Sequence, residues 1–116
     1  MSDARRAAGI SGENLAATAL QQAGYTIVER NYRCKMGEID IIAAKGKTLF
    51  FVEVKARHSS TFAAPRQNIN AAKIRHIRNT ATDYFQKHGG ESMSAFIIAE
   101  VDLESGRVEL IEDSFC

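Results

Sequence analysis

Two short apolar segments separated by a glycine turn constrain the fold of this chain most. Residues 38–43 and 48–56 are rich in Ile, Val and Phe and too short for helices, so both are predicted to be β-strands. Between them, Gly46-Lys47 fits a two-residue type II′ turn, which places Gly at its first central position. Such a turn fixes the register of the hairpin, and this register pairs Ile39 with Val54 at its open end.

The same register brings charged side chains together. It pairs Ile41 with Val52 on a wholly apolar face, whereas on the other face Asp40 lies directly opposite Glu53. Opposed carboxylates with Cβ atoms about 5 Å apart repel each other, and a divalent cation with oxygen ligands would relieve the repulsion. Lys55 projects from the face that carries Glu53, because strand side chains alternate. We therefore predict Mg²⁺ on Asp40 and Glu53, with Lys55 beside a nucleophilic water or a phosphate. The alternative is a solvated strand face on which acid and base neutralise each other.

The rest of the chain predicts two helices and three more strands around this hairpin. The helices are expected at 11–23 and, beginning at Pro65 and ending near His88, at 65–88; the strands are expected at 25–33, 94–101 and 107–111. The element order is therefore α-β-β-β-α-β-β. That order predicts an α/β fold in one domain, with a mixed β-sheet flanked by helices.

Glu13 allows two interpretations. Ser11 is a plausible N-cap, which would put Glu13 in the first helical turn, where the helix dipole favours a negative charge. On that interpretation it is a surface acid that stabilises the helix. It also borders the apolar stripe that contains Ala16 and Leu20, so it could instead supply a third carboxylate to the predicted metal region.

Size and composition place the chain among ordinary globular proteins. Its 116 residues suffice for one domain with a single core, 1–116. No apolar run approaches the roughly 18 residues of a membrane span, and the charged N-terminus lacks a signal core, so a cytoplasmic protein is expected. Cys34 and Cys116 are too few and too far apart for a disulfide framework, and both are predicted to be free thiols.

Charge is distributed unevenly along the chain although the net charge is only +1. Residues 55–88 have a balance of +6, whereas residues 89–116 have a balance of −6. A basic stretch beside a carboxylate site is typical of proteins that act on a polyanion such as nucleic acid. The alternative is that the basic helix and the acidic tail pair with each other across the fold.

The combined pattern resembles a known family. A leading helix with Gly12-Glu13, then Asp40 in 37–43, then Glu53 and Lys55 in 51–57, and finally a basic helix with Lys73, is similar to the PD-(D/E)xK nuclease superfamily and resembles in particular the YraN family. The resemblance also includes Arg30-Asn31-Tyr32-Arg33. It covers about residues 9–85 and is weaker towards the end, where Phe96-Ile97-Ile98 stands in place of the Phe-Asp of many relatives.

The resemblance implies a restriction-endonuclease-like fold and a metal-dependent endonuclease. Carried over by position, Asp40 and Glu53 would bind Mg²⁺ or Mn²⁺, Lys55 would assist catalysis, and Glu13 would complete the acidic cluster. Archaeal Holliday-junction resolvases, which are small dimeric enzymes, share the motif order, so branched DNA is the implied substrate and a homodimer the implied assembly. Three cations are expected to hold flanking phosphates: Arg57, Arg66 and Lys73. A module that binds nucleic acid or protein without turnover is the alternative on the same fold.

Overall fold

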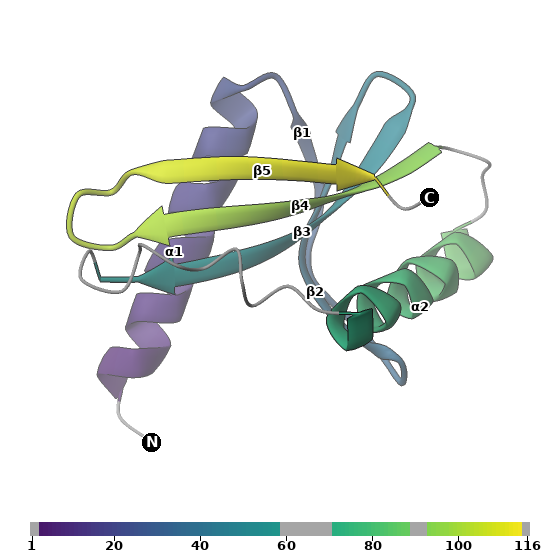
Figure 1. Cartoon of the computed structure of the whole chain (residues 1–116), viewed down its shortest axis with the longest axis horizontal. Helices are drawn as coiled ribbons and strands as arrows, with labels where there is room; N and C mark the ends of the chain where they lie inside the picture. The colour runs from purple at the N-terminus through teal and green to yellow at the C-terminus, as the bar shows by residue number, and fades with distance from the viewer. Residues whose placement is uncertain (1–2, 59–70, 89–92, 115–116) are drawn as a thin grey trace.

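The computed structural model describes residues 3–58, 71–88 and 93–114, and at 3–10, 71, 73, 113 and 114 it describes the backbone alone. Its elements follow the predicted order (Figure 1). They are α1 (Asp3–Gln22), β1 (Thr26–Cys34), β2 (Gly37–Lys45), β3 (Thr48–Arg57), α2 (Ala71–His88), β4 (Met93–Asp102) and β5 (Val108–Ser114). Neither helix within these described ranges is long and apolar enough to cross a membrane.

The five strands form one mixed sheet in the order β1-β2-β3-β4-β5. Strands β3 and β4 are parallel, and the other three neighbouring pairs are antiparallel. Parallel neighbours need a long crossover connection, and the segment that contains α2 supplies it. The mixed α/β fold predicted from the element order is therefore confirmed.

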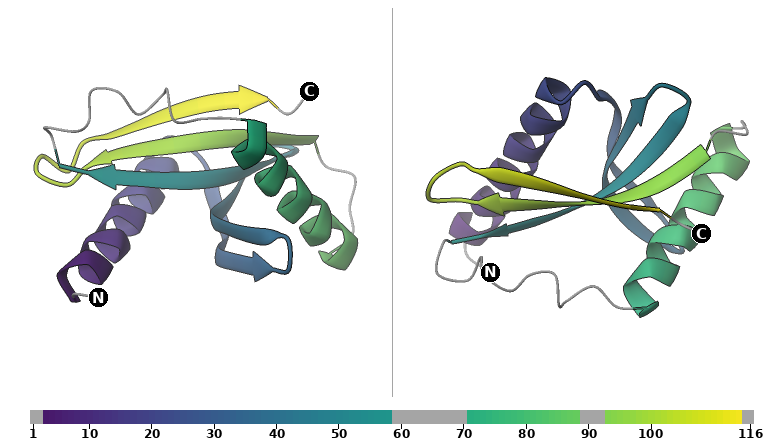
Figure 2. Two further views of the ribbon diagram at one scale, coloured as in Figure 1. Left: turned by 60° about the horizontal axis from the view of Figure 1, so that its bottom comes forward. Right: turned by 45° about the horizontal axis from the view of Figure 1, so that its top comes forward.

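The helices lie on opposite faces of the sheet and define two apolar cores (Figure 2). Side chains alternate between the faces along most of each strand, so neighbouring residues enter different cores. Strand β2 departs from this alternation at Asp40, because Ile39 and Ile41 enter different cores. The α1-side core includes Ala16, Leu20, Ile41, Phe50, Val52 and Ile97. The α2-side core includes Tyr32, Ile39, Ile42, Phe51, Ile77 and Phe96. This division decides which face each polar strand residue occupies.

The predicted hairpin register is confirmed close to the turn and wrong at the open end. Gly46 has φ 63°, as the turn requires, and Ile41 pairs with Val52. The ladder between β2 and β3 ends at that pair. Ile39 enters the α2-side core while Val54 packs against the α1-side core, so the expected pairing of the two does not form. The reason is that the β1–β2 hairpin bends away from the other strands (Figure 2).

Two other boundaries differ from the sequence prediction. Helix α1 begins at Asp3, well before Ser11, so Ser11 is inside the helix and is not its N-cap. Ala and Arg, which favour helices, are frequent at 3–10 and extend the helix past the capping signal. Helix α2 is described from Ala71, and the predicted start at 65–70 lies outside the described residues. Cys34 is a free thiol, as predicted.

Candidate functional site

Asp40 lies where the β1–β2 hairpin separates from β3. Its Oδ2 atom accepts a hydrogen bond of 2.8 Å from the backbone N–H of Val54. Continued pairing would have brought a carbonyl of β2 to that N–H, so the carboxylate takes over a role that normally belongs to the backbone. A partly buried N–H is thereby satisfied, and the Asp40 side chain is fixed against β3. One carboxylate oxygen, Oδ1, is not used in this bond.

The surroundings of Asp40 disfavour its negative charge. Burial raises the pKa of the Asp40 carboxyl to about 6, the hydrogen bond from Val54 opposes this rise, and the carboxylates of Glu53, Glu13 and Glu38 add to it. Three acids therefore act on a fourth that is half-buried. The electrostatics favour binding of a proton or another cation at this point of the fold.

Glu53 and Lys55 lie together on one face of β3. The Nζ atom of Lys55 is 3.6 Å from Oε2 of Glu53, and their side chains are 19% and 18% exposed. Val54 and Ala56 pack against the α1-side core, so Glu53 and Lys55 project towards the other face. The structure thus brings the predicted Glu-x-Lys pair together. The predicted direct opposition of Asp40 and Glu53 is wrong, because the ladder has already ended, yet Glu53 is near enough to raise the pKa of Asp40.

Glu13 reaches the same region from α1. It is in the interior of that helix, so the dipole-stabilised first-turn position is wrong. Its Oε1 atom accepts hydrogen bonds from Arg30 Nη2 at 2.9 Å, Arg30 Nε at 3.1 Å and Asn31 Nδ2 at 3.2 Å. Because Glu13 also raises the pKa of Asp40, its carboxylate acts on the site while Arg30 holds it.

Arg30 and Asn31 are the site residues that sequence reasoning missed, although they stand in a stretch of the family motif. Arg30 also donates a hydrogen bond of 2.6 Å to Asn14. Asn31 has φ 57°, a left-handed conformation that Asn tolerates better than most residues. No spacing rule connects β1 with α1, so only the three-dimensional contact reveals that these residues orient Glu13.

Gly12 sets the approach of α1 to β3 and thereby the place of Glu13. A Cβ atom added at Gly12 would lie 2.5 Å from Cβ of Ala56, closer than real Cβ atoms come.

In an exposed helix Gly→Ala stabilises the fold by about 1 kcal/mol, but at Gly12 overpacking should make the substitution destabilising. We expect Gly12→Ala to lower the free energy of unfolding by about 1–3 kcal/mol, measured by urea denaturation. A matched Gly12→Ala/Ala56→Gly double variant should recover most of the loss, and no recovery would contradict the contact.

The predicted phosphate-binding cations are only partly described. Arg57 is the last residue of β3, is half-buried, and lies in register with Asp102 of β4. Arg66 and the side chain of Lys73 lie outside the described residues. Arg75 and Arg78 are exposed on α2, so a basic surface remains on the described part of that helix. The role of Arg57, Arg66 and Lys73 in holding phosphates stays a prediction.

The donor set fits a small hard cation without forming a closed cage. Residues 3–58, 71–88 and 93–114 contain no group of three or more His, Cys, Asp or Glu side chains placed to hold a metal ion. Mg²⁺ needs no such group, because it is usually bound by one or two carboxylates and completes its shell with water and substrate phosphate. Asp40 and Glu53 supply carboxylate oxygens, and burial, together with the neighbouring carboxylates, raises the pKa of the Asp40 carboxyl.

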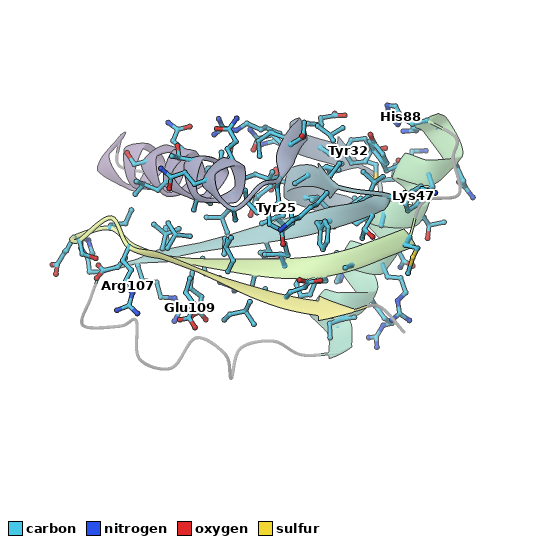
Figure 3. The ribbon with its side chains drawn as sticks, turned by 90° about the horizontal axis from the view of Figure 1, so that it is seen from above. Tyr25, Tyr32, Lys47, His88, Arg107 and Glu109 are labelled. Carbon is cyan, nitrogen blue, oxygen red and sulfur yellow. The ribbon has the colours of Figure 1, made fainter. Side chains whose placement is uncertain are left out.

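Strand β5, at one edge of the sheet, carries the acidic residue Glu109. Glu109 projects from β5 on the side of the sheet away from α1, near Arg107 (Figure 3). It lies opposite Glu100 in the antiparallel ladder with β4. Polar groups therefore continue across β3, β4 and β5, beyond the part of the sheet where Phe51, Phe96 and Ile98 form the α2-side core.

Comparison with known proteins places the chain beside one family. The model of the Uncharacterised protein family UPF0102 matches residues 12–112. A UPF0102 protein of Syntrophus aciditrophicus is 44% identical over 110 residues, which cover 92% of this chain and 87% of the relative. UPF0102 proteins of Caldicellulosiruptor saccharolyticus and Desulfosudis oleivorans are 40% and 42% identical over 116 residues, which cover 96% and 99% of this chain and 98% and 94% of the relatives.

Proposed function

The chain belongs to the UPF0102 family, and from its site geometry we propose that it is a metal-dependent endonuclease that hydrolyses phosphodiester bonds in DNA. The resemblance to PD-(D/E)xK nucleases motivates the reaction class. The observation that carries the proposal is the meeting of Asp40, Glu53 and Lys55 where β2 leaves β3, with surroundings that disfavour the charge of Asp40. A site that disfavours a buried carboxylate charge costs stability, and binding of Mg²⁺ or Mn²⁺ offsets that cost.

Each residue has a distinct role in the proposed reaction. Asp40 and Glu53 would hold the cation, while Arg30 and Asn31 keep Glu13 oriented beside them. When bound, Mg²⁺ would polarise the scissile phosphate and make a water molecule more acidic. The Lys55 ammonium, on the side of Glu53, would orient the attacking water and offset the negative charge that develops on the phosphate.

The cations around the site indicate a polyanionic substrate. A scissile phosphate at the carboxylates leaves neighbouring phosphates for cations around the site, and Arg57 is two residues from Lys55 on the same strand. Exposed Arg75 and Arg78 extend the basic surface on α2. Binding through such contacts should weaken steeply as salt concentration rises. Within this class, branched or otherwise structured DNA is the proposed substrate, because the motif order resembles that of Holliday-junction resolvases.

The direct test is cleavage of labelled linear duplex, nicked duplex, four-way junction and RNA in Mg²⁺, Mn²⁺ or EDTA. We expect products from at least one DNA substrate in either metal and none in EDTA. The Asp40→Ala/Glu53→Ala double variant, purified in parallel, should be inactive. Equal activity of the double variant would identify a contaminating nuclease and overturn the proposal.

A module that binds nucleic acid or protein without turnover is the second candidate. One observation favours it: Glu13 already accepts hydrogen bonds from Arg30 and Asn31, so the third acid of the site is engaged. Metal titration separates the candidates, because such a module needs no Mg²⁺ on Asp40 and Glu53. Tight DNA binding that is equal in Mg²⁺ and EDTA, without cleavage, would favour this second function.

A further inference from the structure

A carboxylate that the sequence did not single out lies near the end of β4, the strand next to β3. Glu100 of β4 is 2% exposed. Its neighbours Ala99 and Val101 belong to the α1-side core, so Glu100 projects from the other face. Burial of a carboxylate in a sheet is costly unless a cation or several hydrogen bonds accompany it. We therefore expect a neighbouring cation to stabilise the buried carboxylate of Glu100.

The strand register places Glu100 beside Lys55. The two residues are partners in the parallel ladder between β3 and β4, and adjacent strands are about 4.8 Å apart. Partners in a ladder project from the same face, so the Lys55 side chain leaves the sheet next to that of Glu100. Lys55 is thus flanked by Glu53 on its own strand, at 3.6 Å, and by Glu100 on the next strand.

Three further charged residues of β3, β4 and β5 lie close in the ladders to Lys55 and Glu100. Glu109 lies opposite Glu100 on β5, one strand farther from Lys55. Arg57 and Asp102 are in register beyond Lys55, and Asp102 accepts hydrogen bonds from the backbone of Glu104 and from Ser105. Asp102 is thereby engaged by the turn that follows β4. Among these acids, Glu100 is the one that is both fully buried and next to Lys55.

We propose that Glu100 is a positioning residue, which holds the Lys55 ammonium in place from β4 while Glu53 contacts it from β3. This inference rests on the proposed nuclease function for its purpose, because a fixed ammonium can orient a water or a phosphate, whereas a mobile one cannot. Glu53 can then bind the cation while Glu100 keeps Lys55 in place. Without Glu100, the long lysine side chain would lose orientation when Glu53 turns towards the metal.

The first test is nuclear magnetic resonance of the intact chain without metal or DNA. With ¹⁵N-labelled lysine, the Lys55 ammonium should give a signal that exchanges slowly with water and shows contacts to the side-chain hydrogens of Glu100. The signal is assigned by its loss in Lys55→Arg. Absence of any contact between Lys55 and Glu100 in the unsubstituted protein would overturn the proposal, and this result does not depend on any variant or on cleavage.

The second test compares Glu100→Gln with Glu109→Gln as the matched control. Glu100→Gln should speed exchange of the Lys55 ammonium at least tenfold and lower kcat about tenfold with KM nearly unchanged, whereas Glu109→Gln should leave exchange near that of the unsubstituted protein. Glu100→Asp, which keeps the charge on a shorter side chain, should fall between. Equal exchange in all three variants would overturn the proposal. If Lys55 and Glu100 are in contact but no substrate is cleaved, the positioning contact stands and the nuclease function fails.

Discussion

Asp40→Asn is expected to raise the free energy of unfolding at pH 8 by about 1–2 kcal/mol while it abolishes cleavage. The carboxyl of Asp40 has a pKa raised from 3.8 to about 6, so at pH 8 the folded protein carries a charge that its surroundings disfavour. Asn removes that charge, and its side-chain oxygen can still accept the hydrogen bond from Val54. Urea unfolding gives the stability, and single-turnover cleavage gives the activity.

The raised pKa of Asp40 determines how the stability gained by Asp40→Asn changes with pH. Below pH 3.8 Asp40 is protonated in both the folded and the unfolded protein. Between pH 3.8 and about 6 the folded protein keeps a proton that the unfolded chain has released, so the stability of the unsubstituted protein falls as pH rises through this window. The advantage of Asp40→Asn should therefore be small at pH 4 and complete above pH 7.

Asp83 provides a matched control with the opposite shift. It accepts a hydrogen bond of 2.5 Å from the Tyr32 hydroxyl and lies 3.3 Å from Lys87. The hydrogen bond from Tyr32, assisted by Lys87, lowers the pKa of the Asp83 carboxyl. Its stabilising contribution is present above the unfolded pKa and is lost as pH falls, so Asp83→Asn should destabilise at pH 8. An Asp40→Asn protein that is also less stable at pH 8 would contradict the conclusion that burial and the neighbouring carboxylates disfavour the charge of Asp40.

The second large effect is expected at Lys55. Lys55→Met should lower the single-turnover cleavage rate about 10²–10³-fold, the loss typical of one preorganised charge-stabilising group. The variant should still gain thermal stability on addition of Mg²⁺, because Asp40 and Glu53 are intact and a ligand that binds the folded state stabilises it. Glu53→Gln should lose both the cleavage and the response to Mg²⁺.

Lys47 is the charge-matched control for Lys55, because it is exposed on the turn between β2 and β3. Lys47→Met removes the same charge from the chain and should leave the cleavage rate nearly unchanged. A Lys55→Met protein that cleaves as fast as Lys47→Met would remove Lys55 from the mechanism. If Lys55→Met no longer gains thermal stability from Mg²⁺, Lys55 is instead required for the carboxylates to bind the cation.

Local patterns account for what the sequence could predict. A glycine turn and two apolar runs determined β2, β3 and their register from Ala43 and Phe50 to Ile41 and Val52. The Glu-x-Lys spacing placed Glu53 and Lys55 on one face, and alternation along a strand is enough for that inference. The element order was sufficient to indicate a mixed sheet between helices.

Non-local contacts account for what it could not predict. The β2–β3 ladder ends where Ile39 joins Ile77 and Tyr84 of α2 in the α2-side core, and the sequence pattern around Asp40 did not predict this association of distant segments. The position of Glu100 beside Lys55 depends on the register of a parallel pair whose strands are separated by a whole helix. The first-turn position expected for Glu13 was likewise wrong, because a serine resembled a helix cap within a longer run of helix-forming residues.

The bond between Asp40 and the Val54 amide gives this protein an intrinsic spectroscopic probe. The amide proton of Val54 touches the very oxygen whose charge would change on protonation or on loading with a cation. The chemical shift of this proton and its rate of deuterium uptake therefore report whether the Asp40 carboxylate holds a proton, a cation or neither. Screening of metal ions, inhibitors or pH can thus follow one backbone resonance, with no knowledge of the substrate.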